Sequence, residues 1–260
     1  MLIKTIKTEK LETYVYDSRD AMGRAAGAEA ARVINKVIEE KGFANVIFAA
    51  APSQNETLAS LLEEQVDFTR INAFHMDEYA GLSIDQPQSF ARYLYDHVFS
   101  KAPFASVNYI PATLDVDSAC AAYTELLTQN PPDVVLMGIG ENGHIAFNDP
   151  PADFDDERAY KVVTLNDACL RQQVREGWFE SPEAAFKQAI SMTCRQIMKC
   201  ECIISVVPHA VTAQAIHDTL TCEINENVPA TLLKNHKDVT VYCDENSASL
   251  TDAKTLARFA

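Results

Sequence analysis

The sequence predicts an α/β protein with one doubly wound, mostly parallel sheet and helices on both faces, in the manner of a Rossmann-like fold. Short apolar runs suited to buried strands alternate along the chain with longer stretches whose apolar residues recur at helical spacing. No repeat, low-complexity linker or block of charge interrupts this alternation. With 260 residues the chain can bury one large core, so we expect residues 1–260 to form a single domain.

The first half of the chain begins its alternation with a long helix. Residues 18–41 are expected to be helical, because Ala26, Ala30 and Val33 fall on one face at helical spacing. The expected elements that follow are a strand at 46–51, a helix at 56–65, a strand at 71–76, and helices at 88–99 and 117–129.

The second half continues the pattern from a central strand at 133–138, whose apolar residues 134–137 read as fully buried. Further strands are expected at 160–165, 202–207 and 239–243, with a helix at 209–221 between the last two. In such sheets ligands bind beyond the carboxyl ends of the strands. Polar residues at three of these strand ends therefore define a candidate site.

The formal net charge of −15 argues against nucleic-acid binding through a broad basic face. It does not forbid a small anionic substrate, which needs only a local pocket of backbone N–H groups and one or two cations.

The composition favours a cytoplasmic protein. Residues 1–25 lack the apolar core of a signal peptide, and no apolar run approaches the length of a membrane span. The seven cysteines are odd in number and fall mostly in apolar or helical stretches, which favours free thiols in a reducing compartment. Cys200 and Cys202 form a CxC, but nothing nearby completes a zinc cage, so no metal site is expected.

The strand end after residue 137 carries the most informative segment, GIGENGHIAFNDP at 138–150. It presents Asn142, His144 and Asp149 within eight residues, and glycines such as Gly143 allow turns and close approach of a ligand. A structural turn with a satisfied histidine is the alternative. A histidine bracketed by amides and a carboxylate favours a site.

The other two strand ends are also polar. Ser53, Gln54 and Asn55 precede a helix, where they can cradle a phosphate or simply cap the helix N-terminus. No GxxxxGK[ST] is present, so this is not a Walker loop. Asp77 and Glu78 can supply a general base, or they can form an acidic turn that caps the next helix.

Three segments together resemble the glucosamine-6-phosphate deaminase/isomerase family. They are FHMDEYAGL at 74–82, GIGENGHIAFNDP at 138–150 and ENVPATLLKNHKDVTVYCDE at 226–245, and the resemblance runs from about residue 20 to residue 245. The same superfamily includes 6-phosphogluconolactonases, whose loop also carries a Gly-His pair but typically continues Ser-Leu-Phe-Pro. This chain has residues 146–149, Ala-Phe-Asn-Asp, at that place, which favours the deaminase side.

The resemblance implies roles for the site residues. His144 would open the sugar ring, and Asp77 would move a proton between C2 and C1 of the open chain. The intermediate releases ammonia from glucosamine 6-phosphate or galactosamine 6-phosphate and leaves a ketose 6-phosphate. The resemblance implies no metal or organic cofactor. We also expect a homo-oligomer, as is common for a cytoplasmic enzyme of this class.

The chain departs from the family pattern at several positions. Asn142 stands where many members have Asp, and Asp149 stands where many have Glu, one methylene longer. The glycine- and threonine-rich phosphate loop of the family is replaced by Ser-Gln-Asn-Glu at 53–56. Glu56 is an odd neighbour for a phosphate unless its carboxylate points away.

The expected phosphate cations differ as well. His209 stands where the family usually has a lysine, and it can contact the phosphate or belong to a helix N-terminus. Arg175 is the candidate for the family's phosphate-binding arginine, with Arg171 as the competing residue. Either arginine can instead be a surface charge on a helix.

The sequence leaves two other functions open. One is a sugar-phosphate lactonase, in which His144 activates water. The other is a catalytically inactive sugar-phosphate sensor, which the altered phosphate loop, Asn142 and Asp149 motivate. Retention of both Asp77 and His144 argues against a pure binder.

Overall fold

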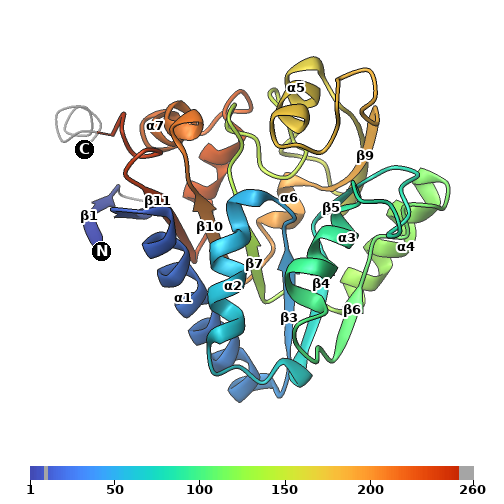
Figure 1. The fold of residues 1–260 in the computed structure, drawn as a ribbon, viewed down its shortest axis with the longest axis horizontal. Helices are drawn as coiled ribbons and strands as arrows, with labels where there is room; N and C mark the ends of the chain where they lie inside the picture. The colour runs from blue at the N-terminus through green and yellow to red at the C-terminus, as the bar shows by residue number, and fades with distance from the viewer. Residues whose placement is uncertain (9–10, 252–260) are drawn as a thin grey trace.

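The centre of the fold is an eight-stranded sheet with the order β1-β2-β11-β10-β7-β3-β4-β6. The computed structural model describes residues 1–8 and 11–251 (Figure 1). The strands are β1 (Leu2–Lys7), β2 (Glu12–Tyr16), β3 (Ala44–Phe48), β4 (Ile71–His75), β6 (Ser106–Asn108), β7 (Val134–Met137), β10 (Cys202–Val207) and β11 (Val239–Asp244). All neighbours in this sheet are parallel except β1 and β2. The predicted mostly parallel α/β fold is confirmed.

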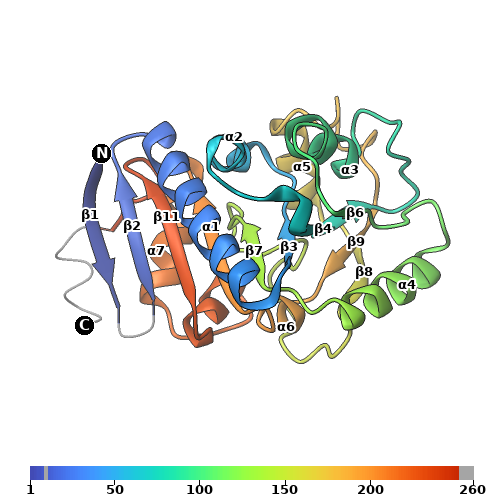
Figure 2. The same cartoon turned by 90° about the horizontal axis from the view of Figure 1, so that it is seen from below.

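Helices cover both faces of this sheet (Figure 2). On one face lie α1 (Arg19–Lys41), α2 (Asn55–Glu63) and α3 (Phe90–Leu94), with α3 continuing as a π-helical turn over Tyr95–Phe99. On the other face lie α4 (Val116–Gln129), α6 (Cys194–Ile197) and α7 (Ala213–Thr221). The remaining helix, α5 (Asp167–Arg175), lies beyond the carboxyl ends of the strands (Figure 1). The helices on each face of the sheet thus enclose a separate apolar core.

Helix α1 shows how the local sequence sets the ends of an element. The Ser18 side chain accepts a hydrogen bond from the Ala21 N–H and caps the N-terminus, as expected for serine at that position. Gly42 ends the helix with φ of 86°, and its N–H donates to the Ile38 carbonyl at 2.8 Å. The positive φ is the reason that a glycine stands there.

Short helical turns lead into two of the predicted helices, and only the helix expected at 209–221 had included such a turn. A 3-10 turn at Pro52–Gln54 precedes α2, and another at Ala210–Thr212 precedes α7. Two further 3-10 segments are Phe68–Arg70 and Pro229–Asn235.

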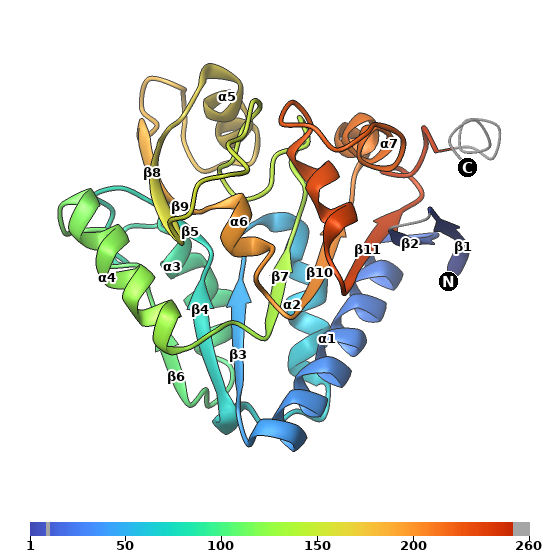
Figure 3. The same ribbon diagram turned by 180° about the vertical axis from the view of Figure 1, so that it is seen from behind.

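A second, three-stranded antiparallel sheet was not predicted. It consists of β5 (Asp77–Tyr79), β9 (Gln188–Met192) and β8 (Tyr160–Thr164), in the order β5-β9-β8 (Figure 3). The strand predicted at 160–165 exists, but it belongs to this small sheet. Strands β1, β2, β6 and β9 were not predicted either. Apolar periodicity identifies a strand by its own residues and carries no information about its partner.

Candidate active site

A cavity of about 540 Å³ opens at the carboxyl ends of β3, β4, β7 and β10. Its walls come from the segments that follow those four strands, from α5 with the turn after it, and from Phe90 of α3. This is the edge at which a doubly wound sheet binds its ligands. All three strand-end segments identified in the sequence contribute a residue to the wall, namely Ser53, Asp77 and His144.

Asp77 is the buried acid of the cavity. Its side chain lines the wall, and the residue is only 7% exposed. Burial raises the pKa of its carboxyl to about 8, with further increases from the neighbouring charges of Glu78 and Glu176. Asp77 therefore keeps much of its proton at neutral pH, and it accepts or releases a proton near that pH.

Glu78 points away from the cavity, although it is the next residue along the chain. Successive side chains of a strand lie on opposite faces, and β5 sends this carboxylate toward the N-terminus of α3. There it accepts hydrogen bonds from the Ser89 hydroxyl at 2.7 Å and from the N–H groups of Phe90 and Ala91 at 3.0 and 2.9 Å. Glu78 is thus the helix-capping acid that the sequence left as an alternative, and it is not a residue of the cavity wall.

His144 is held at one nitrogen and free at the other within the described residues. Its Nδ1 lies 2.7 Å from the Asn142 amide oxygen and 3.3 Å from the Asp149 carboxylate. Because the amide oxygen only accepts, we place the ring proton on Nδ1, which leaves Nε2 able to exchange a proton.

Asp149 is itself fixed by two amides. Asn142 Nδ2 donates to Oδ1 and Asn166 Nδ2 donates to Oδ2, each at 3.0 Å. Burial acts to raise the pKa of Asp149. The hydrogen bond and charge of His144 lower it, as does the hydrogen bond from Asn142. These effects outweigh burial, so the pKa of Asp149 lies below its ordinary value. Asp149 therefore stays ionised beside the imidazole.

Backbone geometry makes room for the imidazole. A Cβ on Gly140 would lie within 2.5 Å of His144 Nδ1, so only glycine fits at that position. Ala146, which lines the cavity, has a φ of 48°, a strained value of the kind that clusters at functional sites. Gly143 serves the turn instead: its φ is 82°, and its carbonyl accepts from the Ala230 N–H at 2.8 Å.

The three residues of the segment 53–55 have different roles. Ser53 lines the cavity, while Gln54 is buried and donates through Nε2 to the Val206 carbonyl at 3.2 Å, which ties this loop to β10. Asn55 is the first residue of α2, and its amide oxygen accepts from the Tyr93 hydroxyl. No side chain caps α2, so the helix-capping alternative for Ser53 and Asn55 is wrong.

The two predicted cations reach the cavity, each with an acidic neighbour. Arg175 lines the wall and forms an ion pair with Glu141, whereas the competing Arg171 is exposed and outside the wall. His209 lines the wall with φ of 78° and ψ of 145°. Its N–H lies 3.2 Å from each carboxylate oxygen of Asp244.

The sequence did not single out two residues that matter here. Glu176 follows α5, lines the cavity and raises the pKa of Asp77. Arg19, the first residue of α1, contacts both Glu56 and His209. The unusual Glu56 could have pointed to Arg19, because a carboxylate that is partly removed from water needs a cationic partner.

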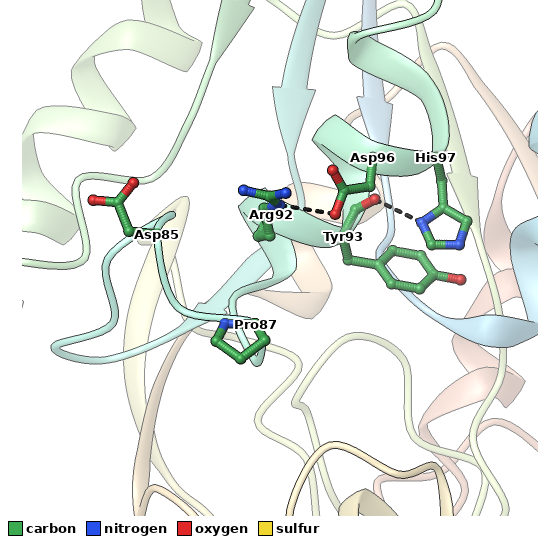
Figure 4. A pocket seen from close by; sticks show the side chains of 6 residues that line it. All are labelled: Asp85, Pro87, Arg92, Tyr93, Asp96 and His97. Carbon is green, nitrogen blue, oxygen red and sulfur yellow. Dashed lines mark hydrogen bonds and ion pairs between the residues drawn. The ribbon is translucent and has the colours of Figure 1, made fainter.

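A second hollow, of about 420 Å³, lies on the surface around α3 (Figure 4). Its charged groups already have partners. Arg92 Nε lies 2.8 Å from the Asp96 carboxylate, and His97 Nδ1 lies 2.8 Å from the Tyr93 carbonyl. We assign it no ligand.

The chain is similar to known proteins in sequence and in fold. The family model described as glucosamine-6-phosphate isomerases/6-phosphogluconolactonase matches residues 17–242. A glucosamine-6-phosphate deaminase of Listeria welshimeri is 37% identical over 229 residues, which cover 87% of this chain and 95% of that protein.

Two solved structures show the same fold. A monomeric glucosamine-6-phosphate deaminase superposes with a TM-score of 0.85 at 29% identity, covering 92% of this chain and 99% of that one. A 6-phosphogluconolactonase from Thermotoga maritima gives a TM-score of 0.74 at 18% identity, covering 89% of this chain and 98% of that one. Within residues 1–8 and 11–251, no helix combines the length and apolarity needed to cross a bilayer.

Proposed function

Because the chain belongs to the family of glucosamine-6-phosphate isomerases and 6-phosphogluconolactonases, we propose that it is a hexosamine-6-phosphate deaminase. It converts glucosamine 6-phosphate or galactosamine 6-phosphate to the ketose 6-phosphate and releases ammonia. The relative at 37% identity carries the deaminase name, whereas the lactonase structure at 18% identity shares the fold alone.

His144 would open the sugar ring in this reaction. Its Nε2 takes the proton from the C1 hydroxyl and passes it to the ring oxygen, which yields the open-chain aldehyde. Asn142 and Asp149 hold Nδ1, keep the ring oriented and stabilise the positive charge while the imidazole carries the extra proton.

Asp77 would then move the proton that defines the isomerisation. Its carboxylate removes the C2 proton beside the aldehyde and returns it to C1. The C1 oxygen gains a proton and the C2 nitrogen loses one, which leaves a hydroxyl at C1 and an imine at C2. Hydrolysis of that imine consumes one water and releases ammonia. These steps are proton transfers and a hydrolysis, so we expect no metal or organic cofactor.

The phosphate would lie at the opposite end of the substrate, against the β3 and β10 loops. We propose Ser53 and His209 as its contacts and Arg175 as a contact at the mouth of the cavity. Gln54 and Asn55 act by holding the loop. Glu78 and Gly143 stabilise the structure around the site, and we do not propose that they touch the substrate.

The observation that carries the proposal is Asp77: a buried carboxyl with a pKa of about 8 that shares one cavity with a carboxylate-supported histidine. The test is ammonia release from glucosamine 6-phosphate and galactosamine 6-phosphate by the purified protein and by two variants. We expect turnover of at least one sugar, with a loss of about 100-fold or more in kcat for both Asp77→Asn and His144→Ala.

Other results would select the alternatives. Acid release from 6-phosphogluconolactone without ammonia would identify a lactonase. Thermal stabilisation by both sugar phosphates without turnover of either would identify a sensor.

The homo-oligomer and the cytoplasmic location stay predictions. The solved deaminase structure with 29% identity is described as monomeric. Sedimentation velocity at micromolar concentration measures the assembly state directly.

A further inference from the structure

The cavity is short of cations for a phosphorylated substrate. Three acids, Asp77, Glu141 and Glu176, line the wall, against one arginine and two histidines, His144 and His209. The arginine, Arg175, is already paired with Glu141. A phosphate dianion entering such a site needs a further positive group near the β3 and β10 loops.

Arg19 supplies a guanidinium at that place. Its Nε lies 2.6 Å from a Glu56 carboxylate oxygen, and its Nη1 lies 2.7 Å from His209 Nε2. Its Nη2 donates to the carbonyl of Pro52, the residue before Ser53. Arg19 thus bridges the loop after β3 and the loop after β10, and both loops line the cavity. Arg19 is not itself a residue of the cavity wall, but its side chain is 26% exposed beside those loops and is open to solvent there.

Arg19 also sets the orientation of His209. A guanidinium has donors and no acceptor, so His209 Nε2 must accept and the ring proton must be on Nδ1. Within the described residues, Nδ1 has no hydrogen-bond partner and remains available as a donor.

The backbone of His209 adds a second sign of function. Its φ of 78° with ψ of 145° lies in a region that residues other than glycine rarely adopt. Strain of this kind persists where a side chain is needed at one place, and here the buried Asp244 carboxylate holds the His209 N–H.

Glu56 explains how the guanidinium stays in place without a ligand. Gly23, one turn after Arg19, faces Glu56 so closely that a Cβ on Gly23 would lie 2.9 Å from the Glu56 carbonyl carbon. The close contact between α1 and α2 therefore brings Glu56 beside Arg19. Its carboxylate neutralises the cation, and an entering phosphate competes for the same donors.

We propose that Arg19 is a substrate-binding residue that, with His209 and Ser53, holds the phosphate of the substrate. The proposal rests on the proposed function for the identity of the substrate. Arg19 thus contributes to phosphate binding, a role that the sequence indicated only for other cations. Glu56 is the counter-ion of Arg19 in the ligand-free state.

The test uses sorbitol 6-phosphate, an analogue that carries the phosphate but has no carbonyl and therefore cannot react. Calorimetric titration of wild type and Arg19→Gln should show a dissociation constant at least about tenfold higher in the variant. The KM for the hexosamine phosphate should rise in step, with a smaller change in kcat. Arg24→Gln is the matched control, because Arg24 lies on the next turn of α1 and pairs with Asp20 on the surface. We expect its affinity to equal that of wild type.

A double variant separates contact from charge balance. If Arg19 holds the phosphate, Arg19→Gln combined with Glu56→Gln stays about tenfold weaker or more, and Glu56→Gln alone binds as tightly as wild type or tighter. Recovery of wild-type affinity in the double variant would overturn the proposal, since Arg19 would then only neutralise Glu56.

The failures of the two proposals are distinguishable. Binding that depends on Arg19, in a protein that releases no ammonia, would refute the deaminase and keep the phosphate site. Ammonia release with an unchanged KM in Arg19→Gln would refute the phosphate site and keep the deaminase.

Discussion

Asp77 and Glu78 are adjacent acids with different environments. Asp77 faces the cavity without a hydrogen-bond donor among the described residues, and its pKa rises to about 8. Glu78 is equally buried, yet four donors from Tyr79, Ser89, Phe90 and Ala91 surround its carboxylate. The alternation of side chains along β5 decides which acid can exchange a proton with a ligand.

The pH dependence of the reaction tests this assignment. Asp77 must lose its proton to act as a base, so kcat/KM should rise with pH to a midpoint near 8. Glu176→Gln removes one of the negative charges that raise the pKa of Asp77, so the midpoint should move to lower pH. The measurement is a pH profile of kcat/KM for ammonia release.

Glu180→Gln is the matched control, because Glu180 is exposed and lies outside the cavity wall. Its profile should coincide with that of wild type. A Glu176→Gln profile that also coincides with wild type would remove Glu176 from the electrostatics of Asp77.

At the scale of elements, the contact between α1 and α2 positions the phosphate end of the site. Gly23 and Gly27 of α1 lie against Glu56 and Ser60 of α2, where an added Cβ would meet backbone atoms at 2.9 Å in both cases. The absent side chains let the two helices approach closely. Arg19, one turn before Gly23, thereby reaches Glu56 and the loop before α2.

Gly23→Ala should therefore push the two helices apart. Overpacking of this kind costs about 1–3 kcal/mol, which exceeds the gain of up to about 1 kcal/mol from the higher helix propensity of alanine. Urea unfolding should show a lower free energy of unfolding. Binding of sorbitol 6-phosphate should weaken as Arg19 moves. An increase in stability would show that the contact is looser than the structure indicates.

At the scale of the whole molecule, the small antiparallel sheet and the large parallel sheet meet at Asp77. Strand β4 of the large sheet ends at His75, and β5 of the small sheet begins two residues later. The only residue between them is Met76, which is buried. The acid is therefore enclosed where the two sheets meet, and its protonation is coupled to the stability of the fold.

This coupling has a definite sign. The pKa of Asp77 is about 8 in the folded chain and near its ordinary value of 3.8 in the unfolded chain, so the folded state holds the proton more tightly. Stability from this group is fully present below pH 4 and is lost as the pH rises toward 8, by at most about 1.4 kcal/mol per pH unit.

Asp77→Asn should abolish the loss of folding stability that the titration of Asp77 causes as the pH rises. The free energy of unfolding of the variant relative to wild type should increase from pH 5 to pH 8, as measured by urea unfolding at both values. Asp155→Asn, at an exposed aspartate, should show the same difference from wild type at the two pH values. A pH-independent difference for Asp77→Asn would mean that the carboxyl titrates normally.

The sequence by itself determined the fold class, the order of most central elements and the three polar strand ends. These features are local: helical spacing, apolar runs and residue types at strand ends are all readable within about ten residues of chain. Asp77 and His144 were found in this way, because each lies in a polar segment beyond the end of a buried strand.

Only the tertiary structure decided which neighbours these residues have. The small sheet pairs β5 with strands from 160–164 and 188–192, and this pairing turns Asp77 inward and Glu78 toward α3. The contact of Arg19 with His209 spans 190 residues of sequence. Pairing, burial and charge proximity depend on segments that are distant along the chain, and no local pattern encodes those distances.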